Sequence, residues 1–156
     1  MKKTCTLPLL IALSLHPAAG SAQQPAATAY KPELIEFMIF TQIRHAKLWL
    51  AGSSANWELA EYEADELKEV LANAVKHVPD YKGMPVGKMI ESIAMGPIQD
   101  LEKTIKAKDH IRFAAAFDKL TAACNTCHQS ANRGFIVIQR PTGSAFPNQS
   151  FSPRRN

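Results

Sequence analysis

The sequence predicts an all-α fold, an antiparallel four-helix bundle. Four stretches carry apolar residues at three- and four-residue steps, and short segments rich in Gly, Pro and Asn separate them. No run of alternating apolar and polar residues competes as a set of strands. Short connections favour antiparallel neighbours, and a chain of 156 residues has room for one such core.

The chain opens with features of an export signal over residues 1–22. Met1-Lys2-Lys3 is positively charged, the apolar stretch extends from Leu7 to Ala18, and small residues precede the expected cleavage after Ala22. A transmembrane anchor is the alternative, but an apolar run of about a dozen residues is shorter than the roughly 20 that cross a bilayer. We therefore expect a periplasmic protein with no stable membrane anchor. Cys5 would leave with the signal.

A flexible leader and the first helix follow. Residues 23–31 are small, polar and proline-containing, without an apolar period. The first helix is expected over 32–51, because Pro suits the first helical position and one face repeats at helical spacing. That face consists of Leu34, Met38, Thr41, His45 and Leu48. Gly52-Ser53-Ser54 ends it.

The second helix is expected over 57–77, with Asn56 as its N-cap. Its buried face should consist of Leu59, Tyr62, Leu67, Val70, Leu71, Ala74 and Val75. The acidic residues of this segment, Glu63 among them, are expected to lie mostly outside.

The third helix is expected over 85–107, with a kink or break at Gly96-Pro97, because proline removes a backbone donor and clashes with the preceding turn. The fourth begins after Asp109, a suitable cap, and ends before Gly134. The bundle domain therefore spans 32–133. Residues 134–156 contain Pro141, Gly143, Pro147 and Pro153 after Gly134. This composition predicts an irregular C-terminal arm over the bundle end.

The pentapeptide Cys124-Asn125-Thr126-Cys127-His128 is the one specific motif. Two thiols three positions apart on a helix share a side, and the next residue is an imidazole that can reach an iron held between them. The motif predicts one covalent haem c, attached at Cys124 and Cys127, with His128 as an axial iron ligand.

Three other interpretations of the two cysteines stay open. A structural disulfide needs nothing more than an oxidising compartment. A thioredoxin-like redox pair belongs near a βαβ pattern, which this sequence lacks. A zinc site needs further ligands, and the remaining histidines of the expected bundle do not cluster with the motif: His45, His77 and His110.

A signal, four helices and the pentapeptide on the last helix together resemble the cytochrome c′ type of four-helix-bundle cytochrome, over roughly residues 32–133. The resemblance implies that the haem lies between the first and last helices, near the open end of the bundle, with His128 as proximal ligand. It also brings a homodimer into consideration. The long ending over residues 134–156 departs from the family, which usually stops soon after the motif.

The other face of the iron should meet the first helix, whose start lies beside the end of the last helix in an antiparallel bundle. Met38 is the expected distal ligand, since a thioether is a known partner of histidine-bound haem. His45 is the rival on the same face. Seven residues at about 1.5 Å each separate the two by roughly 10 Å, so one iron cannot take both. Arg44 and Lys47 either pair with the haem propionates or are solvated.

The sixth ligand divides the expected functions. Iron bound by His128 and Met38 has no open position and suits one-electron transfer with a periplasmic redox partner protein. Iron bound by His128 alone suits the binding of nitric oxide or carbon monoxide. A peroxidase would need polar distal groups such as His45 and Gln42. We expect an electron carrier rather than an enzyme.

The net charge of the chain gives little information about its binding partners. The formal charge of +4 includes Lys2 and Lys3, so the mature chain would carry +2. Acidic and basic residues are interspersed, without the stripe of basic and aromatic residues that nucleic-acid binding requires. No nucleic-acid partner is expected.

Overall fold

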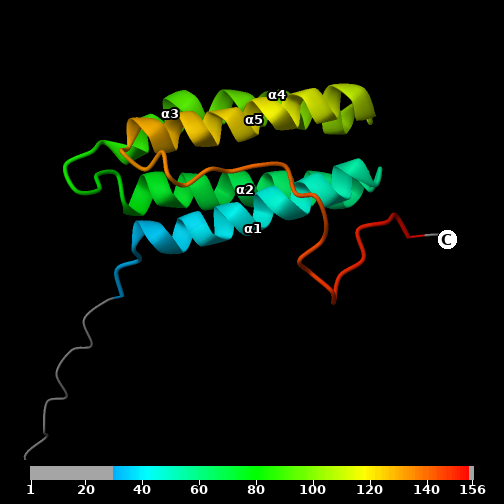
Figure 1. Cartoon of the computed structure of the whole chain (residues 1–156), viewed down its shortest axis with the longest axis horizontal. Helices are drawn as coiled ribbons and strands as arrows, with labels where there is room; N and C mark the ends of the chain where they lie inside the picture. Colours follow the sequence, from blue (N-terminus) through cyan, green and yellow to red (C-terminus); the bar gives the residue numbers. More distant parts are fainter. Residues whose placement is uncertain (1–29, 155–156) are drawn as a thin grey trace, which may run out of the picture. The chain divides into compact units, whose positions relative to one another are not determined.

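The structure is a computed structural model that describes residues 30–154, and over this range it is helical, without a β-strand (Figure 1). The all-α prediction is confirmed. The expected export signal, and residues 23–29 of the expected leader, lie outside the described residues. The helices are α1 (Leu34–Ser53), α2 (Trp57–His77), α3 (Val86–Ile93), α4 (Met95–Lys106) and α5 (His110–Ser130).

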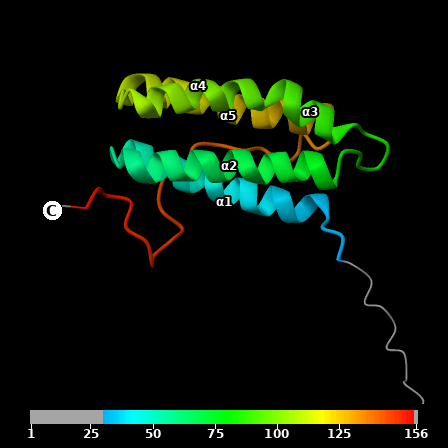
Figure 2. The same ribbon diagram turned by 180° about the vertical axis from the view of Figure 1, so that it is seen from behind.

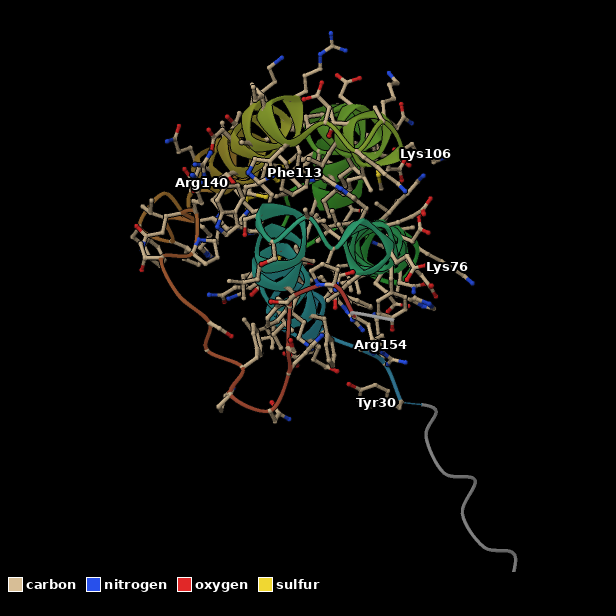
Figure 3. The ribbon with its side chains drawn as sticks, turned by 90° about the vertical axis from the view of Figure 1, so that its right-hand side faces the viewer. Tyr30, Lys76, Lys106, Phe113, Arg140 and Arg154 are labelled. Carbon is tan, nitrogen blue, oxygen red and sulfur yellow. The ribbon has the colours of Figure 1, made fainter. Side chains whose placement is uncertain are left out.

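The helices form two layers. The first contains α1 and α2, and the second contains α3, α4 and α5, as the two opposite views in Figures 1 and 2 show. Seen from the end of the bundle in Figure 3, Phe113 points between the layers, while Lys76 and Lys106 point outward. Leu48, Leu67 and Phe113 are among the largest side chains that the core buries completely.

The helix boundaries follow from local capping. A capping box holds the start of α1, because Glu33 and Glu36 each accept a backbone N–H of the other, and the helix therefore begins two residues after Pro32. Asn56 caps α2, its side-chain oxygen accepting the Leu59 N–H at 3.3 Å, and Asp109 caps α5 in the same way through Arg112 N at 2.9 Å. Both predicted caps are confirmed.

The break in the third predicted helix occurs at Ala94, three residues before Pro97. Proline has no N–H to donate to the carbonyl four residues earlier, which belongs to Ile93, the last residue of α3. α3 therefore ends at Ile93, whose carbonyl has no N–H donor four residues later. Gly96 and Pro97 themselves lie in the first turn of α4, where a missing donor costs little.

The predicted buried face of α2 is wrong at one turn. Tyr62 is 51% exposed, whereas Glu63 is only 1% exposed. Arg44 explains why Glu63 is buried in place of Tyr62. Its guanidinium lies 3.1 Å from the Glu63 carboxylate and 2.9 Å from the Glu66 carboxylate, and it also lies over the Tyr62 ring, 5.6 Å from the ring centroid. A charge is thus buried together with its counter-charge.

The segment after α5 runs back along the bundle as an irregular strap (Figure 1). Arg140 stacks over the Trp49 ring at 4.1 Å and meets Asp118 at 2.6 Å. Further along, the Phe151 side chain is buried, and the Asn56 side chain donates to the Ser152 carbonyl at 3.2 Å. No helix among residues 30–154 combines the length and the apolar character needed to cross a membrane.

Candidate functional site

A cavity of about 330 Å³ lies where the start of α1 meets the end of α5, and this volume is in the range of small-molecule and cofactor sites. The predicted attachment cysteines and candidate axial ligands all line it, although they come from distant parts of the chain: Met38, His45, Cys124, Cys127 and His128. Gln42 lines it as well.

The rest of the wall is mainly apolar. It comes from α1, α2, α3, the loop before α3 and the segment after α5: Leu34, Ile35, Ile39, Leu71, Tyr81, Met84, Val86, Ile90, Ala94, Ile136 and Ile138. A cavity of this kind favours a largely apolar occupant held by a few polar groups.

Cys124 and Cys127 are unbridged and partly buried. Burial, reinforced by the neighbouring Cys127, raises the pKa of the Cys124 thiol to about 11, and burial also raises the pKa of the Cys127 thiol. A redox-active pair depends on a thiol with a lowered pKa. The environment of these two thiols therefore does not favour the thioredoxin-like interpretation.

The His128 ring has a defined orientation. Its Nδ1 lies 2.9 Å from the Ile136 carbonyl oxygen. A carbonyl can only accept, so Nδ1 carries a proton and Nε2 is the ring nitrogen left to face a metal. Histidine ligands of metals are commonly held in this way, with the second ring N–H donated to a backbone carbonyl.

The segment after α5 supplies this carbonyl and part of the cavity wall. Asn125, inside the pentapeptide, donates to the Ile138 carbonyl at 2.9 Å and accepts the Ile138 N–H at 2.7 Å. Ile136, Ile138 and Arg133 were not predicted to belong to the site. The only sequence signal for the two isoleucines was the short apolar run 135–138 after Gly134, and Arg133 had none.

His45 is buried against α5, with 3% of its surface exposed. Its Nε2 lies 2.9 Å from the Thr121 hydroxyl, which itself donates to the Phe117 carbonyl at 3.0 Å. Since the hydroxyl proton goes to Phe117, Nε2 is the protonated nitrogen of His45. Burial lowers the pKa of His45 to about 4, so the ring is neutral at physiological pH.

Two methionines line the cavity. Met38 comes from α1, as predicted, and Met84 comes from the loop before α3, where Tyr81 and Met84 pair in an isolated β-bridge. Met84 was missed because irregular segments carry no apolar period to read. Both thioethers are candidate ligands, and their positions on different elements allow each to be tested separately.

The two basic residues proposed for propionates are engaged elsewhere. Arg44 pairs with Glu63 and Glu66, and the Lys47 ammonium lies over the Phe146 ring at 5.0 Å. Arg133 lines the cavity instead and is the better placed of the three for a carboxylate.

The donor set fits a haem better than a bare metal ion. Among the residues that the structure describes, no three His, Cys, Asp or Glu side chains gather as a metal site. A haem brings four ring nitrogens of its own and needs from the chain an apolar slot, two thiols and one or two axial ligands. The cavity contains residues of each kind. Comparison with protein-family models, curated proteins and solved structures finds no match.

Proposed function

We propose that this chain is an exported monohaem c-type cytochrome, an antiparallel four-helix bundle that holds one covalent haem c between α1 and α5 and transfers single electrons. One observation carries the proposal: Cys124, Cys127 and His128 line the same apolar cavity as Met38 from the opposite layer. The start of α1 meets the end of α5 at this cavity, while Gly52, near the end of α1, meets Phe113, near the start of α5. These two contacts support the antiparallel arrangement.

Three residues of the pentapeptide hold the haem in this proposal. The Cys124 and Cys127 thiols would add to the two vinyl groups of a haem as thioethers and so hold it covalently on α5. His128 ligates through Nε2, the nitrogen left free by the Ile136 carbonyl. The haem, when bound, supplies an iron that alternates between the ferric and ferrous states.

Met38 determines which function the site performs. As sixth ligand its thioether closes the iron and raises the reduction potential, which suits electron transfer. The geometry of His45 favours Met38 over its rival, because His45 Nε2 is already donated to Thr121. Export to the periplasm and a periplasmic redox partner protein complete this proposal.

The apolar lining favours a second candidate function. If Met38 packs as an ordinary core residue, His128 is the only axial ligand, and the apolar distal side binds nitric oxide or carbon monoxide, as the resemblance to the cytochrome c′ type implies. A peroxidase has less support, since Gln42 is exposed and His45 is held by Thr121.

Haem staining of the exported protein after denaturing electrophoresis tests the proposal. Wild-type protein should carry covalent haem, and Cys127→Ser should lose it or hold it weakly. Cys5→Ser is the matched control and should stain like wild type, because Cys5 lies in the expected signal. Normal covalent haem in Cys127→Ser contradicts the site assignment.

Absorption spectra of the reduced protein, with and without carbon monoxide, separate the two candidate functions. Bands that carbon monoxide does not move indicate a closed, six-coordinate electron carrier. Bands that shift indicate an open iron and favour the gas-binding function.

A further inference from the structure

We infer that Asn125 is a positioning residue for the proximal ligand: by clamping Ile138 it holds the Ile136 carbonyl on His128 Nδ1. This inference rests on the proposed function. Asn125 occupies one of the two variable positions inside the pentapeptide, where no thioether or iron ligand is expected.

The clamp is a pair of hydrogen bonds to a single residue. Asn125 Nδ2 donates to the Ile138 carbonyl at 2.9 Å, and Asn125 Oδ1 accepts the Ile138 N–H at 2.7 Å. An amide side chain satisfies both backbone groups at once, as a neighbouring strand would. The other variable residue, Thr126, is exposed and bonds only within its own helix, to the Ala122 carbonyl at 3.0 Å.

The chain between the motif and the clamp turns back sharply. Asn132 takes a left-handed conformation, with φ of 55°, and the Arg133 N–H returns to the His128 carbonyl at 2.7 Å. Ile136 then donates its own N–H to the Arg133 carbonyl at 2.8 Å. This turn brings the following segment back beside His128. The Asn125 clamp then fixes that segment at Ile138, two residues after Ile136, whose carbonyl contacts His128 Nδ1.

The consequence for the ligand is electronic as well as steric. A hydrogen bond from the second ring nitrogen fixes the tautomer and makes the imidazole a stronger donor to the metal. A stronger donor stabilises the ferric state, so the reduction potential falls. Loss of the clamp should therefore raise the potential and weaken the orientation of the ring.

Two measurements on the exported, haem-bearing full-length protein test this inference. Amide hydrogen exchange reports the clamp at the Ile138 N–H, and spectroelectrochemical titration reports the reduction potential. In Asn125→Ala, and in Asn125→Leu, which keeps the branched shape of the side chain without its polar atoms, the Ile138 amide should exchange at least tenfold faster and the potential should rise. Thr126→Ala is the matched control and should leave both unchanged.

The two ways of failing are distinct. A potential equal to that of wild type in both Asn125 variants, with the Ile138 exchange accelerated, overturns the inference, because the clamp would then be structural only. A wild-type protein without covalent haem overturns the proposed function and the inference with it, and that result appears before any variant is made.

Discussion

His45 Nε2 donates to the Thr121 hydroxyl at 2.9 Å, and this bond joins the middle of α1 to the middle of α5. The ring is buried and neutral, with its pKa lowered to about 4 from 6.5. The unfolded chain therefore takes up a proton on this histidine at a higher pH than the folded protein does.

The folded protein should become less stable as the pH is lowered from about 6.5 to about 4. Between about pH 6.5 and pH 4 the unfolded state binds more protons at His45, so the free energy of unfolding decreases as the pH drops, by about 3 kcal/mol in total. His45→Gln keeps a polar partner for Thr121 without a titrating group. Urea unfolding at several pH values should give a shallower slope for this variant, and equal slopes contradict the assignment of the pH dependence to His45.

A second prediction concerns Gly52, which lies against the Phe113 ring. A Cβ at Gly52 would overlap the Phe113 ring, and Phe113 is fully buried. Gly52→Ala should therefore destabilise the protein by about 1–3 kcal/mol through overpacking. Gly96→Ala is the control, since nothing lies within 4 Å of its Cβ position in the first turn of α4. Thermal unfolding should separate the two variants, and equal melting temperatures refute the tight contact.

A third prediction concerns the buried carboxylate. Arg44→Ala leaves Glu63, which is 1% exposed, without its nearest counter-charge, so unfolding should become easier by about 3–5 kcal/mol. The Asp100–Lys103 pair has the same kind of contact, at 2.8 Å, but its side chains are 62% and 74% exposed. Asp100→Ala should have a much smaller effect in the same chemical denaturation, because water screens an exposed ion pair. A small effect of Arg44→Ala would mean that water reaches Glu63.

A fourth prediction distinguishes the two methionines of the cavity. On the proposed function, Met38→Ala opens the sixth position, and the reduced protein should then bind carbon monoxide with a shift of its absorption bands. Met84→Ala removes the same side chain from the same cavity and should keep the wild-type spectrum. If only Met84→Ala opens the iron, the distal ligand comes from the loop before α3 instead of α1.

The helices were predictable because their signals are local. Asn56 and Asp109 are caps that act within one turn, and the period of apolar residues covers each helix. The failures have a tertiary cause. Glu63 is buried and Tyr62 exposed because Arg44 on the neighbouring helix supplies a counter-charge, and no pattern within α2 records that.

The candidate site was predictable to the same extent. The pentapeptide is a contiguous signal, and Met38 followed from the expected order of the helices. Ile136, Ile138 and Met84 lie in segments without regular structure, where position depends on individual hydrogen bonds and not on residue spacing. The motif and the helix order therefore identified the candidate ligands on α1 and α5 and missed the irregular wall of the cavity.

The strap after α5 makes the motif dependent on residues that follow it. Phe135 and Val137 are 79% and 71% exposed, so a protease has access to this stretch, whereas Ile136 and Ile138 line the cavity. A single cleavage after Gly134 would leave the helices α1 to α5 and the whole pentapeptide uncut. It would nevertheless detach the segment that forms one wall of the cavity. The cleaved protein would still contain the complete motif, but it would lack the Ile136 carbonyl that orients His128.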